Sequence, residues 1–474
     1  MLVRQSLIYS MGSIIPGAIA ALLLMLYTRL LTPEEFGLYA LVMAAIEFTW
    51  SLSLSWLSTA MVRLFPAQNN IPRFLGSILS FFVAISLLVF VCVFTLIFFI
   101  DDNRLQTLAI LGVLLFIATG WMELNSSLFM ARLEARRSAV IRITRSVGAG
   151  LFAAAFVVAG AGAEGILIGA TLGMLLPGIS QIYRDWRHAE GVGRFRDSDD
   201  LVKIGKPLAG GIAVGSVGAY AGQVIVTALE GVAAFGFYAV GAEMAERLVM
   251  AILGPLSTAA APLATHDLEK SGPEAAKERL ASACILMIGI MAPATVGLIL
   301  VAPDIVTVLI GEEFQEMTLV LLPLATIATM LFAFRAGYMD QSFHLGMKQN
   351  FLFWREVVYL FVTVLNAFLL VSAYGVVGLG YAAVATTTIM LVVTHLFSRH
   401  AFTLPYPKAE IGKIILATIV MGAIVFVLPV EAGWTGLIVK PLIGVSAYAA
   451  VVLLLDVSGT RELVSGLLRS RLAA

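Results

Sequence analysis

Long apolar runs separated by short polar segments make up almost the whole chain. Runs of about 20 mainly apolar residues, the length that crosses a bilayer as a helix, begin near residues 7, 36, 75, 105, 141, 164, 207, 232, 280, 317, 351, 375, 411 and 435. The first run is longer than the apolar part of a signal peptide, so we interpret it as a span. The pattern predicts an all-α integral membrane protein with about fourteen transmembrane helices and no separate soluble domain.

The composition agrees with a chain that faces lipid. Of its 474 residues, 60% are hydrophobic and 13% are charged, and the mean hydropathy is +0.97. A typical soluble domain is about 45–50% apolar and about 25% charged. The excess apolar residues need a non-aqueous partner, and runs of this length fit the lipid bilayer. The formal net charge of zero gives no indication of a nucleic-acid partner.

The sequence pattern predicts no cofactor chemistry. The five histidines lack the spacing of a metal site, and no Gly-rich nucleotide-binding loop is present. The two cysteines, Cys92 and Cys284, lie inside apolar runs and predict no disulfide framework. We therefore expect no cofactor, no metal site and no ATP hydrolysis.

Positive charge is distributed unevenly between the two sets of loops. If the N-terminus is cytoplasmic, 25 of the 30 lysines and arginines fall on that side and three on the other. The positive-inside rule then predicts that both termini are cytoplasmic. The opposite loops carry acidic residues, among them Glu35, Glu164 and Asp304, which we interpret as solvated.

The chain contains an internal repeat. Phe36–Ala40 (FGLYA) recurs as Phe235–Ala239 (FGFYA), and at the same shift residues 28–64 show thirteen identities without a gap. Glu47, in the middle of the second predicted span, falls on Glu246, in the middle of the eighth. A Phe-Gly-x-Tyr motif and an intramembrane glutamate in register are matches that an apolar composition does not produce by itself.

A weaker echo extends the repeat, because Gly120–Glu123 (GWME) resembles Gly337–Asp340 (GYMD). A repeat unit of about six spans predicts an N-terminal lobe at residues 1–200 and a C-terminal lobe at 201–403, followed by two extra helices and a tail at 404–474. An even number of spans gives both halves the same orientation, so we expect lobes related by an axis along the membrane normal, around a central cavity.

The segment Thr28–Leu41 (TRLLTPEEFGLYAL) resembles the first loop of the polysaccharide transporter family of oligosaccharide flippases. That family belongs to the multidrug/oligosaccharidyl-lipid/polysaccharide (MOP) exporter superfamily. The resemblance implies two six-helix lobes that move an undecaprenyl-diphosphate-linked oligosaccharide from the cytoplasmic to the outer leaflet of the bacterial inner membrane, by alternating access. It also implies a polysaccharide polymerase and glycosyltransferases as candidate partners. In related lipid II flippases an extra helix pair forms a groove for the lipid tail.

Two other functions stay open on the sequence. A drug or metabolite antiporter of the same superfamily would differ only in the width and charge of its cavity. A membrane polysaccharide polymerase or ligase usually has a large outer loop with catalytic arginine and histidine, whereas the outer loops here are short and acidic. We therefore expect a transporter rather than an enzyme.

Ionisable residues within the spans are the candidates for substrate binding or ion coupling, since each costs about 2.5–3.5 kcal/mol or more at the bilayer centre. They are Glu47, Glu123, Glu243, Glu246, Arg247, Arg335 and Asp340. Glu243 and Arg247 have the spacing of a helical ion pair, which either neutralises itself or holds an arginine that binds an anion. Glu47 and Glu246 are candidate ion-coupling or gating residues, with helix packing as the alternative.

A second set of candidates lies at the predicted cytoplasmic mouth. Because only Arg247 and Arg335 are placed deep within the spans, we expect the diphosphate to meet positive charge at the mouth instead. The cluster predicted there consists of Arg63, Arg132, Arg136 and Arg137.

Overall fold

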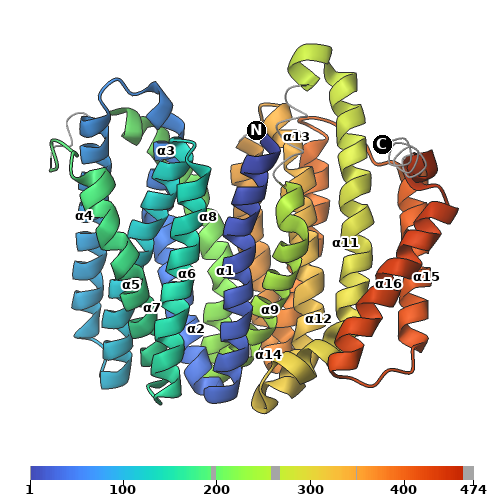
Figure 1. Ribbon diagram of the computed structural model, residues 1–474, viewed down its shortest axis with the longest axis horizontal. Coiled ribbons are helices and arrows are strands. Elements are labelled where there is room, and N and C mark those ends of the chain that lie inside the picture. Colours follow the sequence, from blue (N-terminus) through green and yellow to red (C-terminus); the bar gives the residue numbers. More distant parts are fainter. Residues whose placement is uncertain (1, 194–198, 258–266, 349, 463–474) are drawn as a thin grey trace. The chain divides into compact units, whose positions relative to one another are not determined.

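The computed structural model describes residues 2–193, 199–257, 267–348 and 350–462, which are α-helical apart from short turns and loops. Figure 1 shows these helices running side by side within each part of the chain. The spans expected near residues 36, 75 and 105 begin at Pro33, Ile71 and Asn103. The predicted all-α membrane fold is confirmed.

The first half of the chain forms α1 (Leu2–Leu30), α2 (Pro33–Ser53), α3 (Ser55–Leu64), α4 (Ile71–Ile97), α5 (Asn103–Ala131), α6 (Ala135–Val158) and α7 (Gly162–Gln181), which a π-helical turn (Ile182–Trp186) continues. The second half forms α8 (Asp199–Glu230), α9 (Val232–Ser257), α11 (Pro273–Leu309), α12 (Glu312–Phe334), a π-helical turn (Arg335–Met339), α13 (Gln341–Leu345), α14 (Asn350–Ser398), α15 (Lys408–Val427) and α16 (Trp434–Leu454).

Eleven helices in the described part of the chain are long and apolar enough to cross a membrane. One of them is α14, with 49 residues, which Gly375 interrupts at φ 59° and ψ −143°, where the sequence predicts a new span. In α1, the apolar stretch Ile15–Leu30 is shorter than any of these eleven helices. The chain is therefore a multi-pass membrane protein, and the count of fourteen spans stays a prediction.

Local capping explains where several helices begin. Thr32 caps α2 by accepting a hydrogen bond from the Glu35 amide at 3.3 Å, and Pro33 follows at the first helical position. Asp102 caps α5 in the same way, through the Arg104 amide at 2.7 Å. Gly160, with φ 85°, turns the chain between α6 and α7, because glycine adopts this left-handed conformation without steric cost.

The chain divides into two compact units. Unit 1 comprises residues 1–239 and 359–376, and unit 2 comprises 240–358 and 377–474. The lobes predicted at 1–200 and 201–403 stay predictions, and the two units are described separately below.

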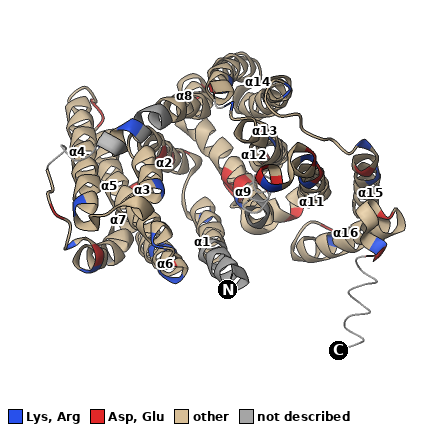
Figure 2. Ribbon diagram, turned by 90° about the horizontal axis from the view of Figure 1, so that it is seen from above, with Lys and Arg blue, Asp and Glu red and all other residues tan. Residues whose placement is uncertain are grey.

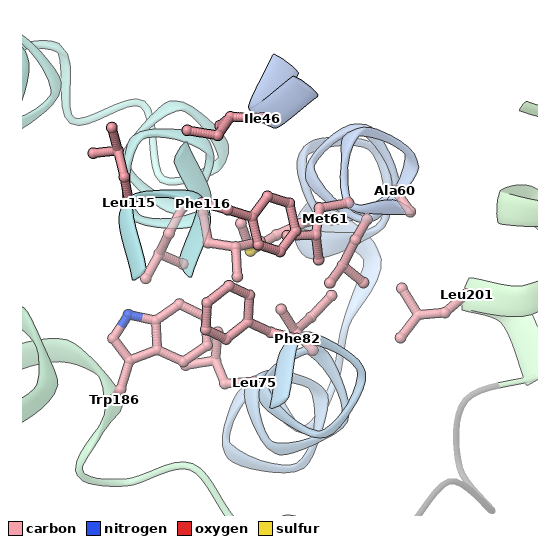
Figure 3. Close-up of a cluster of buried hydrophobic side chains, with 14 of the residues drawn as sticks. Ile46, Ala60, Met61, Leu75, Phe82, Leu115, Phe116, Trp186 and Leu201 are labelled. Atoms are coloured by element: carbon pink, nitrogen blue, oxygen red, sulfur yellow. The ribbon is translucent and has the colours of Figure 1, made fainter. Parts of the chain in front are cut away.

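The core of unit 1 lies among α2, α3, α4 and α5 (Figure 3). Met61, Phe82 and Phe116 are buried there, in contact with a larger apolar cluster that includes Leu75 and Trp186. Trp186 packs into this core and so connects the π-helical turn after α7 to it. The end of α7 is therefore fixed by packing as well as by its helical hydrogen bonds.

The repeated Phe-Gly motif is explained by a close approach between α2 and α9. A Cβ atom added to Gly37 would overlap the carbonyl oxygen of Val232, and one added to Gly236 would overlap that of Pro33. Gly236 is the repeat counterpart of Gly37, and Val232 is the counterpart of Pro33. The two contacts are therefore reciprocal between the two copies of the motif.

Unit 2 is built around α11. Cys284, Met287 and Met291 of this helix are buried together with Tyr338 and Met339 of the π-helical turn. Helix α16 is joined to α11 by a hydrogen bond of 2.7 Å from the Tyr448 hydroxyl to the Gly289 carbonyl.

The outward faces of the long helices are apolar. Leu87, Leu88, Phe94 and Leu96 on α4 are all at least half exposed, and Figure 2 shows that charged residues occupy little of the helices seen from above. Such faces are expected against lipid tails rather than water.

Candidate functional site

Glu47 lies in the middle of α2, and it is exposed. Its carboxylate accepts a hydrogen bond of 3.2 Å from the Tyr220 hydroxyl of α8. One turn further along, the Ser51 and Ser216 hydroxyls are 2.5 Å apart. An exposed carboxylate at this depth is costly against lipid, so the seam between α2 and α8 is expected to border water or a polar substrate.

On α9, Glu243 and Arg247 form the ion pair that their spacing predicts, with an N···O distance of 2.5 Å. Both side chains are a little over a quarter exposed. Glu246, the repeat counterpart of Glu47, is exposed beside the pair. Two carboxylates and one guanidinium therefore lie close together on α9, in a span that the sequence predicts, and their roles in binding or coupling stay predictions.

Glu123 of α5 is paired with Arg145 of α6 at 2.5 Å. The sequence places Arg142 and Arg145 at the start of a span near residue 141, but α6 begins at Ala135, so both arginines lie inside it. Arginine and alanine are good helix formers, so the polar start of this segment is helical as well. Both arginines thus belong to the helix rather than to a loop before it, and the expectation that only Arg247 and Arg335 lie deep within the spans stays a prediction.

Asp340 belongs to a buried charge cluster in unit 2. Its carboxylate pairs with Arg355 of α14 and lies 3.9 Å from Arg335. Arg355 also pairs with Glu356, and its side chain is only 7% exposed. Arg355 is one of the 25 basic residues that the sequence assigns to the cytoplasmic side, and its partners become visible only when α14 packs against the π-helical turn at Arg335–Met339.

The echo between GWME and GYMD has a structural basis. In each motif the acidic residue forms an ion pair with an arginine of the following long helix. In each, the aromatic residue donates a hydrogen bond to a distant backbone carbonyl: Trp121 to Gly178, at 2.9 Å, and Tyr338 to Pro405. The repeat thus preserves an arrangement of contacts as well as a string of residues.

The loop between α14 and α15 completes the surroundings of Tyr338. The Ser342 hydroxyl donates to the Phe402 carbonyl at 2.6 Å, and the Tyr406 ring packs edge-on against Tyr338. Burial raises the pKa of Tyr406 to about 12. Its hydroxyl is therefore neutral at physiological pH and lies 3.4 Å from Nδ1 of His395.

Two of the four arginines predicted at the cytoplasmic mouth already have protein partners. Arg132 and Arg137 both bind Asp185, at 2.7 and 2.5 Å, and the Asp185 side chain is only 4% exposed. Arg63 and Arg136 are exposed. The phosphate contact stays a prediction, and the geometry leaves Arg63 and Arg136 more accessible than the pair bound to Asp185.

Acidic residues interpreted as solvated prove to be paired. Asp304 is fully buried within α11 and accepts a hydrogen bond of 2.7 Å from the Lys440 ammonium of α16, so its interpretation as a loop residue is wrong. At the starts of α2, α5 and α7, Arg104 bridges Glu35 and Glu164 at 2.7 and 2.8 Å. Because these partners are distant in sequence, the pairs could not be recognised from a local pattern.

In the described residues, no group of three His, Cys, Asp or Glu is placed to hold a metal ion.

Comparison with known proteins adds a family and a fold. A family described as polysaccharide biosynthesis protein matches residues 26–319. None of the curated protein sequences matches the chain. Solved structures are similar as well, at low sequence identity.

A lipid II flippase, MurJ, in an inward closed conformation has a TM-score of 0.79 and 14% identity, over 97% of this chain and 100% of that one. A MOP superfamily transporter from Pyrococcus furiosus has a TM-score of 0.59 and 14% identity, covering 87% of this chain and 95% of that one. An outward-facing multidrug resistance MATE transporter has a TM-score of 0.59 and 15% identity, over 84% and 94%. At such identities the likeness establishes a shared fold.

Proposed function

The chain belongs to the polysaccharide biosynthesis protein family, and from this premise we propose that it flips a lipid-linked oligosaccharide across the bacterial inner membrane. The substrate in this proposal is an undecaprenyl-diphosphate-linked repeat unit, moved from the cytoplasmic to the outer leaflet by alternating access. The family description and the fold shared with a lipid II flippase and other MOP transporters support a transporter rather than an enzyme. Both termini lie in the cytoplasm in this proposal.

The observation that carries the proposal is the exposure of charge at mid-helix. Glu47 and Glu246 are exposed near the middle of α2 and α9, two helices that the sequence predicts to be spans. Exposed carboxylates at this depth require a polar neighbour, because their insertion against lipid tails is unfavourable. A transport path that holds water and sugar hydroxyl groups supplies that neighbour, and a passive helix bundle does not.

A drug or metabolite antiporter is the second candidate, favoured by the similarity of the fold to multidrug transporters. The two functions differ in their effect on the cell. Loss of a flippase leaves lipid-linked oligosaccharide in the cytoplasmic leaflet, whereas loss of an antiporter changes the export of a small molecule.

Deletion of the gene is expected to cause accumulation of lipid-linked oligosaccharide in the cytoplasmic leaflet, and the wild-type gene should reverse it. Arg247→Ala is expected to lower the rate of flipping about tenfold or more, since a hydrogen bond to a charged group contributes about 1.5–3 kcal/mol. Lipid-linked pools can be measured by mass spectrometry after leaflet-selective enzymatic release. Unchanged pools and intact surface polysaccharide in the deletion strain would contradict the flippase and favour the antiporter.

Glu47 and Glu246 are proposed as ion-coupling or gating residues of the same cycle. Glu47→Gln and Glu246→Gln keep the shape of the side chain and remove its titration, so each is expected to reduce gradient-driven flipping about tenfold while facilitated exchange persists. Transport into vesicles with and without an imposed proton or sodium gradient measures the difference. If the double Gln variant responds to the gradient as the wild type does, the coupling role is wrong, and the residues only fix helix packing.

A further inference from the structure

The two motif-related ion pairs differ in their charge balance. In unit 2, Arg335 and Arg355 are balanced by Asp340 and Glu356. In unit 1, the corresponding group contains Glu123 and Arg145, with Arg142 one turn away on α6. The cluster in unit 2 is neutral, whereas the one in unit 1 has one excess positive charge.

Arg142 has only weak partners for a cation within a membrane-spanning helix. Its Nε donates to the Ser126 hydroxyl at 3.3 Å, and its Nη2 lies 3.9 Å from the Met130 sulfur. Neither neutralises the guanidinium, and Arg142 forms no ion pair with any residue that the structure describes. In the described part of α5 and α6, no carboxylate pairs with Arg142 as Glu356 pairs with Arg355 in unit 2.

The two clusters also differ in the exposed fractions of their side chains. The Arg145 and Glu123 side chains are 29% and 33% exposed, against 7% for Arg355 and 14% for Asp340. Met130, which contacts Arg142, is 39% exposed. The cluster in unit 2 is closed, and the one in unit 1 is open at its edge to a molecule from outside the protein.

The position of Arg142 along α6 indicates which kind of anion can bind to it. It is the eighth residue of α6, which places it about 10 Å along the axis from the start of the helix, at 1.5 Å per residue. A long arginine side chain at this depth reaches the level of lipid headgroups. The planar guanidinium favours phosphate oxygens, to which it can donate two parallel hydrogen bonds.

We propose that the seam between α5 and α6, centred on Arg142 with Arg145 beside it, binds the phosphate group of a membrane lipid. The phosphate takes the place of the second carboxylate that Glu356 provides in unit 2. The lipid is either the diphosphate carrier of the substrate or an anionic glycerophospholipid. Only the carrier as occupant rests on the proposed function, because the excess charge and the open edge are properties of unit 1 itself.

Native mass spectrometry of the purified full chain tests the site directly. The probes are undecaprenyl diphosphate and dioleoylphosphatidylglycerol, with zwitterionic dioleoylphosphatidylcholine as the background lipid. Arg142→Gln is expected to weaken binding of the anionic probe about tenfold, and Arg142→Lys to retain part of it. Arg73→Gln removes an equal charge from an exposed position at the start of α4, outside the proposed sites, and should change binding less than about twofold.

A second variant separates binding from folding. Met130→Glu places a carboxylate beside Arg142, at an exposed position that tolerates a polar side chain, so it should abolish binding of the lipid phosphate and leave the melting temperature unchanged. Preference for undecaprenyl diphosphate identifies the carrier as the occupant, and preference for phosphatidylglycerol identifies a headgroup site. Absence of binding to the wild type, or equal binding by the wild type, Arg142→Gln and Met130→Glu, overturns the proposal. Because the readout is binding, a negative result here leaves the flipping assay as a separate test of the proposed function.

Discussion

Replacing Lys440 with methionine is expected to lower the free energy of unfolding by about 3–5 kcal/mol, because it leaves a fully buried carboxylate without its counter-ion. Asp304 is 0% exposed, and its partners are the Lys440 ammonium at 2.7 Å and the Gly433 amide at 3.1 Å. One amide hydrogen bond does not compensate for the lost positive charge. The variant is therefore expected to loosen α16 from α11.

A thiol-reactive dye can measure this loss in detergent. Cys284 is buried in α11 and Cys92 is exposed on α4, so in a Cys92→Ser background the dye reports the opening of unit 2 on heating. Lys277→Met is the matched control, since its partner Glu274 is 83% exposed and such surface pairs contribute about 0–1 kcal/mol. Asp304→Asn combined with Lys440→Met should recover most of the stability. Equal destabilisation by Lys440→Met and Lys277→Met would show that the buried pair has no special role.

Alanine at Gly37 or Gly236 is expected to destabilise the protein by about 1–3 kcal/mol, the usual cost of overpacking. The added Cβ would meet backbone atoms of the opposite helix, the carbonyl of Val232 or that of Pro33, and backbone cannot move aside as a side chain can. The α2–α9 crossing must therefore widen. Flipping should also fall, because Glu47 and Glu246 lie further along the same two helices.

Size-exclusion profiles of fluorescently tagged variants and melting temperatures in detergent measure this effect. Gly297→Ala is the matched control, because it lies inside α11 with no atom within 4 Å of the added Cβ. There the substitution should be neutral or slightly stabilising, since alanine is the better helix former. If Gly37→Ala and Gly236→Ala behave like this control, the repeated motif has a role other than close helix packing.

The apolar runs located the helices because the requirement for crossing a bilayer is local in the sequence. Each span must be apolar over the thickness of the bilayer, so its limits can be recognised from consecutive residues. The same local geometry predicts the pair Glu243–Arg247, since residues four apart on a helix are neighbours. The internal repeat and the family resemblance were likewise visible in consecutive residues, and the match of the family to residues 26–319 confirms the resemblance.

Candidate sites that depend on distant residues could be predicted only in part. Glu123 and Asp340 were recognised as costly intramembrane acids, but their partners Arg145 and Arg355 lie on other helices. Asp185, which holds Arg132 and Arg137, carried no signal at all. A charge in a short polar segment has the same appearance in sequence whether it is solvated or buried, and burial is decided by packing.

The amino-acid pattern alone identifies this chain as a membrane protein made of apolar helices, with a repeat in its two halves and glutamates at matched positions. These properties follow from hydropathy, which acts residue by residue over the width of a bilayer. Which charges are neutralised depends on how the helices pack: packing buries Asp304 against Lys440, balances Asp340 with Arg355, and leaves Arg142 beside Ser126 and Met130. The physical reason is that charge compensation acts over a few ångströms in space, between side chains as far apart in the sequence as Asp304 and Lys440.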